Sequence, residues 1–275
     1  MKFSEDFAAV HAYLCSDGMV KQFGKHYQIK FTNIDAVLLN DFDKRFVREF
    51  GIKPHHYEEG HISKLIVFNK TLFFDLLKFG PYDSRNWKVP FSFLTKKTAA
   101  LWLRAFFDAE GWVELQAAKS RSVRVDCINE NGMKQVAKLL GRFGIRSQLK
   151  IREPNYMWRL NICGKENLAK FKDKIGFLHP AKAELMHKIV ESYKDYEWDL
   201  PRTKSNVIKF VKKNGRLRKS RGEIRFFSIK RDNLTSFKKV LNKYKLHSKL
   251  QGPWLNSQGR KYYCLLLKEM EVKNL

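Results

Sequence analysis

Two short segments at matching positions place the strongest constraint on how this chain folds. Val10–Gly18 and Leu103–Gly111 each run an apolar, helix-like stretch into an acid and then a glycine, and the two acids, Asp17 and Glu110, are 93 residues apart. Glycine commonly ends a helix because it accepts the left-handed backbone conformation, so we expect each acid on the last helical turn. An acid there faces the negative pole of the helix dipole and is unfavourable by roughly 0.3–1 kcal/mol. Two acids in this position indicate a role beyond folding.

Small residues line one face of both expected helices. They stand five positions and one position before each acid, as Ala12, Ser16, Ala105 and Ala109. Residues four apart share a helix face, and small residues there let two backbones approach closely, as between membrane helices. Packing through these faces brings Asp17 beside Glu110. The alternative is a duplicated helix and turn in which each acid is only the residue that happens to end its helix.

The sequence around the two segments also repeats. A strand-like stretch and a helix-like stretch follow each acid, and then Gly51 and Gly144, each 34 residues after its acid. Two more strand-like stretches and a closing helix complete each copy. A repeat of this length predicts two units of the same topology, residues 1–95 and 96–195. The expected strands are 25–32, 53–57 and 61–68, then 123–128, 146–152 and 156–162, and the expected helices are 35–50 and 71–78, then 133–143 and 166–174.

A third copy without the acid is expected at residues 196–275. Lys243–Leu250 aligns without a gap with Arg142–Leu149, and the strand-like and helix-like stretches follow the same order. Upstream, lysines and Asn214 stand where an acid would have to be. We interpret this copy as a basic binding extension, or alternatively as a half-domain that completes the core.

The two acidic segments resemble the signature of the LAGLIDADG homing endonucleases. Leu103–Gly111 fits that nine-residue signature well, above all in its last six residues, Phe-Phe-Asp-Ala-Glu-Gly. Val10–Gly18 is a looser match, because Cys15 takes the place of the family's earlier Asp or Gly. The resemblance implies an α+β fold of two pseudo-symmetric α-β-β-α-β-β-α units, whose antiparallel sheets form saddles over DNA, with a related C-terminal extension.

Two adjacent buried acids predict a bound cation. They cannot both stay ionised cheaply without one, and Mg²⁺ takes oxygen ligands and completes its shell with water or substrate phosphate. The family resemblance implies the same chemistry: Asp17 and Glu110 would hold Mg²⁺ (or Mn²⁺) and hydrolyse both strands of a long, asymmetric duplex site. Two motifs in one chain imply a monomeric, metal-dependent endodeoxyribonuclease, of the kind associated with intron or intein mobility.

The charge of the chain predicts a nucleic-acid partner. It carries 54 Lys and Arg against 28 Asp and Glu, a net charge of +26, which is typical of nucleic-acid binders. Alternation in the expected strands gathers base-reading and phosphate-binding residue types on one face of each sheet. The expected DNA-binding residues are Lys25, Gln28, Lys30, Arg124, Arg146, Gln148, Lys150, Arg152, Arg159, Asn161, Arg225, Lys249 and Lys261.

The expected active-site lysines are missing. Members of the family usually carry one near each acid, at the end of the first long strand or the start of the next helix. Those regions read Thr32-Asn-Ile-Asp35 and Ile128-Asn-Glu-Asn131, with Lys25, Lys119 or Lys134 as the nearest substitutes. A catalytically impaired DNA- or RNA-binding protein of the same fold, such as a maturase or regulator, is therefore the second hypothesis. A structured-RNA-processing enzyme is a weaker third, because no RNP-type aromatic motif is present.

Composition excludes several other classes. The charged first residues and the lack of a long apolar run predict neither a signal peptide nor a membrane span, so we expect an intracellular, cytoplasmic and nucleoid-associated protein, with an organelle not excluded. The four cysteines are isolated, which favours free thiols over disulfides or a zinc site. Sequence alone leaves open the DNA target and whether an intron, an intein or a free-standing gene encodes the chain.

Overall fold

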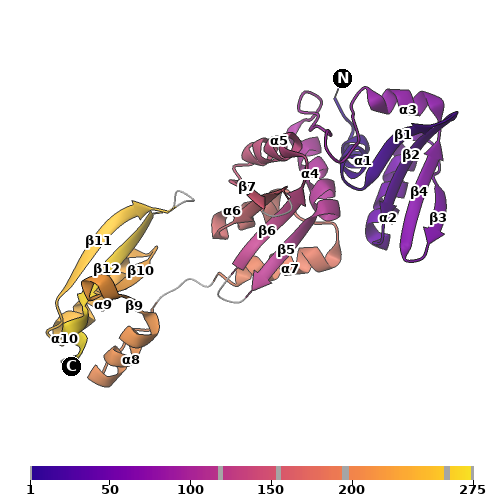
Figure 1. Ribbon diagram of the computed structural model, residues 1–275. Helices are drawn as coiled ribbons and strands as arrows, with labels where there is room; N and C mark the ends of the chain where they lie inside the picture. The colour runs from indigo at the N-terminus through magenta and orange to yellow at the C-terminus, as the bar shows by residue number, and fades with distance from the viewer. Residues whose placement is uncertain (1, 117–119, 153–155, 194–197, 257–260, 274–275) are drawn as a thin grey trace. The chain divides into compact units, whose positions relative to one another are not determined.

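The computed structural model describes residues 2–116, 120–152, 156–193, 198–256 and 261–273. The chain divides into two compact bodies, Met1–Tyr193 and Lys194–Leu275. The first body contains two repeats and the second contains a third (Figure 1). No helix in the described ranges is both long and apolar enough to cross a membrane.

The first repeat has the order α-β-β-α-β-β-α. Its sheet has the strand order β1-β2-β4-β3, and all its neighbouring strands are antiparallel. Side chains that cap helix N-termini fix the helix starts: Ser4 for α1, Asp35 for α2 and Asn69 for α3. The elements are α1 (Glu5–Ser16), β1 (Gly18–Phe23), β2 (His26–Asn33), α2 (Ala36–Phe50), β3 (His55–Glu59), β4 (Ile62–Phe68) and α3 (Lys70–Leu77).

The second repeat has the same topology and one additional helix. Its sheet order, β5-β6-β8-β7, matches that of the first strand for strand. The predicted α+β fold with antiparallel sheets is confirmed. The elements are α4 (Lys96–Glu110), β5 (Gly111–Gln116), β6 (Ser120–Cys127), α5 (Glu130–Gly141), β7 (Gln148–Arg152), β8 (Met157–Cys163), α6 (Lys165–Lys174) and the additional α7 (Pro180–Glu191).

The third repeat forms a complete unit of its own. Its sheet has the neighbour order β9-β10-β12-β11, the same as in the other two repeats. Its core, which includes Phe226, Phe237 and Leu265, is separate from the core of the first body. The elements are α8 (Lys204–Asn214), β9 (Arg216–Arg218), a 3₁₀ turn (Lys219–Arg221), β10 (Glu223–Ser228), α9 (Arg231–Lys243), β11 (Ser248–Leu255), β12 (Lys261–Lys268) and α10 (Glu269–Lys273).

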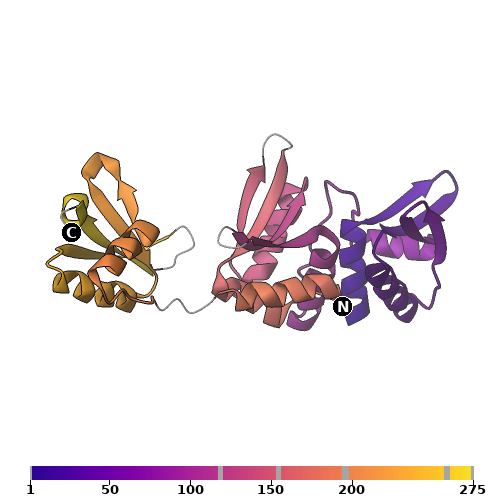
Figure 2. The same ribbon diagram turned by 90° about the horizontal axis from the view of Figure 1, so that it is seen from below.

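Helices α1 and α4, the motif helices, pack against each other in the middle of the first body (Figure 2). Ala12 and Ala105 are buried, within one core that runs through both repeats. A buried hydrogen bond joins the two helices: Nε1 of Trp102 donates to Nδ1 of His11, 3.1 Å away. Nε2 of His11 donates a hydrogen bond to the carbonyl oxygen of Phe79, 3.2 Å away. The imidazole is thus neutral, and burial lowers the pKa of His11 to about 4.

The glycines after the motif helices do not have the left-handed conformation that the sequence analysis expects. Gly111 has φ −92° and ψ 156°, an extended conformation that leads straight into β5. Glycine is needed here for space instead. A Cβ at Gly111 would lie 2.6 Å from the carbonyl oxygen of Phe107, and one at Gly18 would lie 2.3 Å from Cα of Leu14. The close approach of strand and helix, rather than a turn, requires these two glycines.

The third repeat keeps this junction but changes the residues around it. Gly215 follows α8 in an extended conformation, and a Cβ there would lie 2.6 Å from the carbonyl oxygen of Val211. Asn214 occupies the place of the acid. Lys209 and Lys213, both exposed, stand five positions and one position before Asn214, where Ala12 and Ser16 stand before Asp17. Helix α8 therefore lacks both the acid and the small-residue face.

Replacing Gly111 by alanine tests the origin of the junction. We expect Gly111→Ala to lower the free energy of unfolding by about 2 kcal/mol or more, because the Cβ meets fixed backbone atoms. Gly141→Ala is the control, since nothing lies within 4 Å of a Cβ at this helical glycine; it should raise stability by about 0.5–1 kcal/mol. Urea denaturation of both variants measures the difference, and a harmless Gly111→Ala would refute this account of the junction.

Candidate functional site

The two motif acids lie at the ends of packed helices and act on each other electrostatically. Asp17 is the C-cap residue of α1, and Glu110 is the last residue of α4. Burial and, to a lesser extent, the negative charge of Asp17 raise the pKa of Glu110 to about 7, against the opposing positive charge of Lys182. Burial also raises the pKa of Asp17. The two carboxylates share one partly dehydrated environment, so they are the candidate functional site.

The end of strand β2 orients Asp17. The side-chain Nδ2 of Asn33 donates to Oδ2 of Asp17 at 2.8 Å. The Oδ1 of Asn33 in turn accepts from the backbone N–H of Asp35 at 2.9 Å, where α2 begins. In the sequence, Asn33 stands where a lysine is expected. The structure gives it a defined contact with the acid.

Lys182 on α7 lies near the candidate site and was not predicted from the sequence. Its ammonium donates to the backbone carbonyl of Asp108, near the C-terminal end of α4. Burial lowers the pKa of Lys182, whereas four nearby carboxylates raise it. These belong to Asp108, Asp35, Asp17 and Glu110. One cation therefore lies among the acids that include the candidate pair.

The buried Asp108 holds the start of α7 in this place. Its carboxylate accepts from the backbone N–H of Leu178 at 2.8 Å and from that of His179 at 3.1 Å. His179 caps α7, and its Nε2 lies 2.5 Å from Oδ2 of Asp35. In the sequence, only Asp108 hints at this contact: it is an acid inside an apolar helix, and a buried acid requires polar partners. Nothing local to Asp108 points to residues 70 positions further along the chain.

Lys25 and Lys134, two of the lysines named from the sequence, do not take this place. Lys25 lies in the turn between β1 and β2, and Lys134 on α5 forms an ion pair with Glu130 at 2.6 Å. Lys119 lies outside the described residues.

A divalent metal fits the acid pair. Within the described ranges no group of three or more His, Cys, Asp or Glu side chains is arranged to hold a metal. Mg²⁺ does not require such a cage, because it is commonly bound by one or two carboxylates with water and substrate phosphate. Two carboxylates that resist joint ionisation provide such a donor set. The predicted ligands Asp17 and Glu110 are therefore compatible with Mg²⁺ or Mn²⁺.

The outer face of the second sheet gathers six of the thirteen expected DNA-binding residues. Residues directly opposite in antiparallel strands share a face. The register pairs Gln148 with Asn161, Lys150 with Arg159, and Asn161 with Arg124. The buried residues Leu160 and Ile162 alternate with this set and point into the core.

Acids that the sequence analysis overlooked lie on the same face. Asp126 accepts two hydrogen bonds from Arg159, at 2.7 and 2.6 Å, and one from Arg152 at 3.1 Å. Glu114 forms an ion pair with Arg124. Part of the basic face is therefore neutralised within the protein, and the guanidinium groups are held in fixed orientations.

Several expected DNA-binding residues lie elsewhere than the alternation predicts. Arg146 lies two residues before β7, and its backbone N–H donates to Oδ1 of Asn167. Lys25 lies in a turn, although Gln28 and Lys30 do share the outer face of the first sheet.

In the third sheet, Arg225 and Lys249 lie opposite the same residue, Leu266, and share one face. Lys261 is adjacent to Tyr262 at the start of β12, so alternation assigns it to the other face.

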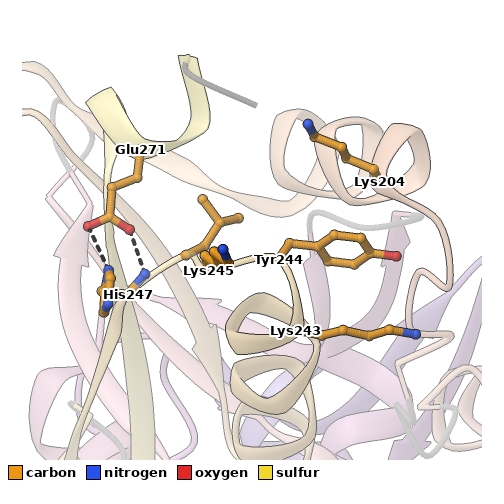
Figure 3. A pocket seen from close by; sticks show the side chains of 7 residues that line it. Lys204, Lys243, Tyr244, Lys245, His247 and Glu271 are labelled. Atoms are coloured by element: carbon orange, nitrogen blue, oxygen red, sulfur yellow. Dashed lines mark hydrogen bonds and ion pairs between the residues drawn. The ribbon is translucent and has the colours of Figure 1, made fainter.

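A separate cleft lies in the third repeat, on residues outside the acid site. Lys204, Lys243, Tyr244, Lys245, Leu246, His247 and Glu271 line it. Figure 3 shows its one acid, Glu271, bonded to both the backbone N–H and the side chain of His247. This cleft carries no acid pair and is not the candidate site.

Comparison with known proteins identifies the second repeat. A family model described as a LAGLIDADG-like domain matches residues 97–176, which contain Glu110 and run from α4 to α6. The second repeat is a LAGLIDADG-like domain. The resemblance to the LAGLIDADG family is thereby confirmed.

The curated relatives of this chain are much longer proteins. Two are probable translation initiation factors IF-2. The one from Methanocaldococcus jannaschii is 28% identical over 182 residues, covering 60% of this chain and 15% of the relative. The one from Thermococcus kodakarensis is 35% identical over 187 residues, covering 64% and 16%.

A third relative is a glutamine–fructose-6-phosphate aminotransferase of Methanocaldococcus jannaschii, which is 30% identical over 126 residues and covers 43% of this chain and 11% of the relative. The chain spans at most about one sixth of the length of these relatives.

Two solved LAGLIDADG structures are similar at low identity. I-DmoI in complex with DNA and Mn is 16% identical with a TM-score of 0.47, covering 61% of this chain and 96% of that chain. Full-length DUF199/WhiA from Thermatoga maritima is 14% identical with a TM-score of 0.49, covering 78% and 68%.

The raised pKa of Glu110 predicts a pH-dependent stability. Its folded-state pKa of about 7 exceeds the ordinary value of 4.5, so the unfolded chain releases this proton first, and the free energy of unfolding falls as the pH rises from about 4.5 to 7. Without metal at pH 8, Glu110→Gln should be more stable than the wild type by on the order of 2 kcal/mol. At pH 4.5 the two should be equal.

Denaturant unfolding at the two pH values, with the exposed Glu58→Gln as control, measures this effect. Added Mg²⁺ should stabilise the wild type and leave Glu110→Gln unchanged. A variant whose advantage does not depend on pH would contradict the shared environment of the two acids.

Proposed function

We propose that the protein is a site-specific double-stranded DNA endonuclease that hydrolyses phosphodiester bonds with a divalent metal. The pairing of Asp17 with Glu110, whose pKa is raised to about 7 by burial and by the neighbouring acid, carries this proposal. The basic sheet faces and the net charge of +26 support DNA as the substrate. An intracellular location near DNA follows from such a substrate.

Each residue of the site has a distinct role in this proposal. Asp17 and Glu110 hold Mg²⁺ or Mn²⁺ through carboxylate oxygens, and Asn33 fixes the orientation of Asp17 by donating to its Oδ2. When bound, the metal stabilises charge on the phosphodiester and acidifies an attacking water. Lys182 places a positive charge beside both acids and is suited to stabilise the negative charge that develops on phosphate oxygens.

The two repeats support an asymmetric target read by one chain. Their sheets have the same topology, so each provides an equivalent saddle. The side chains on the two faces differ: Gln28 and Lys30 on the first, and Gln148, Lys150 and Asn161 on the second. Different residues read different bases. A monomer with two unlike half-sites fits this arrangement.

The curated relatives support a mobile coding sequence. A translation initiation factor and an aminotransferase have unrelated activities, yet each contains a short segment similar to this chain. The shared segment therefore accounts for neither activity. An endonuclease sequence inserted into different host genes, as an intron or an intein, accounts for its presence in both.

A DNA-binding protein that does not cut is the second candidate, and the position of Lys182 favours it. The ammonium already supplies a positive charge beside Asp17 and Glu110, so the fold can tolerate the acid pair without metal. Cleavage in the presence of Mg²⁺ decides between the two.

Cleavage of a randomised duplex library with Mg²⁺, followed by sequencing of the ends, tests the proposal. We expect recurrent ends at one long site with the wild type and none with Glu110→Gln. Lys182→Met should lower the cleavage rate at least about a hundredfold while duplex affinity stays within threefold, because it removes charge stabilisation. Lys188→Met on the exposed side of α7 should leave the rate unchanged. Retained duplex without discrete ends would favour the non-cutting binder.

The salt dependence of duplex binding tests the second sheet as a DNA surface. Lys150 is exposed and lies opposite another cation, Arg159. Lys150→Ala should weaken duplex binding and reduce the slope of log K against log salt by about one, the loss of one phosphate contact. Lys188→Ala should leave the slope unchanged. Equal slopes for both variants would exclude Lys150 from the interface.

A further inference from the structure

Three aromatic side chains form a row across the third sheet. Trp254 on β11 lies directly opposite Tyr262 on β12, and their ring centroids are 5.7 Å apart. Phe227 on β10 pairs with Cys264, two residues along β12, and its ring centroid is 6.2 Å from that of Tyr262. The rings therefore follow one another over three neighbouring strands.

This row lies on the face of the sheet away from the core. Ile224 and Phe226 alternate with Phe227 on β10 and are buried, and Phe226 packs on Phe237 of α9 with a centroid distance of 5.0 Å. Phe227 and Trp254 instead keep 41% and 40% of their surface exposed. The helix that completes the core thus covers the opposite face, and the row faces outward.

Cations surround the row on the same face. The guanidinium of Arg216, on β9, lies 5.9 Å from the ring centroid of Phe227. Lys249 and Gln251 precede Trp254 on β11, and Lys249 lies opposite Leu266 as Arg225 does. The residues from 194 onward contain 22 lysines and arginines against seven acids. The partner of this face is therefore an anion that also offers flat, apolar groups.

Unpaired nucleobases match this surface better than duplex DNA does. In a duplex the base faces are stacked on one another and only the base edges are accessible in the grooves. The exposed aromatic rings of the third sheet would then have no base face to stack on. A single strand offers each base face together with a phosphate, and aromatic rows flanked by cations bind it at about 1–3 kcal/mol per stacked base. The outer face of the second sheet, with Gln148, Lys150 and Asn161, is by contrast rich in edge-reading residues.

We propose that the third repeat binds single-stranded nucleic acid, with bases stacked on Phe227, Tyr262 and Trp254 and phosphates held by Arg216 and Lys249. A row of this kind takes about two or three bases. The binding requires neither Asp17 nor Glu110, so it does not depend on cleavage. It gives the third repeat a ligand different from the duplex proposed for the first two.

Fluorescence anisotropy with the full chain in EDTA tests this proposal. The probes are labelled dT12, labelled rU12 and a 12-base-pair DNA duplex. Trp254→Ala and Tyr262→Ala should each weaken binding of the single strands about tenfold and leave duplex affinity within twofold. Comparison of dT12 with rU12 shows whether DNA or RNA supplies the strand.

Two further variants separate stacking from general damage. Trp254→Phe keeps a flat ring and should retain most of the single-strand affinity. Leu255→Ala, at a neighbouring residue that is 67% exposed, should have no effect. Single-strand affinity that survives Trp254→Ala would overturn the proposal, and so would a variant that weakens duplex and single-strand binding equally. Circular dichroism confirms that each variant is folded.

Discussion

The burial of two carboxylates side by side at the ends of two packed helices is the constraint on which this structure depends. Like charges in a partly dehydrated site raise each other's pKa and oppose joint ionisation. The protein answers with fixed partners: Asn33 donates to Asp17, and Lys182 lies beside both acids. Asp108 holds the start of α7 and so determines where that lysine lies. The site is therefore set by contacts from two elements beyond the motif helices, β2 and α7.

Repetition made most of the fold predictable from the sequence. The spacing from Asp17 to Gly51 equals that from Glu110 to Gly144, which indicates the same elements and connections in both copies. Because sheet order depends on element order and connection length, the two copies are expected to share one topology. The strands of the second sheet alternate in the expected way, so Gln148, Lys150 and Asn161 were assigned to the correct face. Periodicity reports which face a side chain occupies, and for these residues that was sufficient.

Contacts between distant segments were not predictable in the same way. Lys182 reaches the acids from a helix that belongs to neither repeat pattern, and no local signal marks it. Asp126 and Glu114 share the face of the arginines they neutralise, and the basic residues alone do not reveal this pairing. The glycine after each motif helix was identified correctly but for the wrong reason, since a left-handed turn and a close backbone contact both select glycine.

The lysines on α8 also affect which of the three similar helices pair with each other during folding. Three helices end in the same helix–glycine–strand junction, and any two with small faces are able to pair during folding. Burying Lys209 and Lys213 against another helix would remove two charges from water, at a cost of several kcal/mol. The third unit is thus a poor competitor for either motif helix, and the partnership of α1 with α4 is protected from the chain's own repeat.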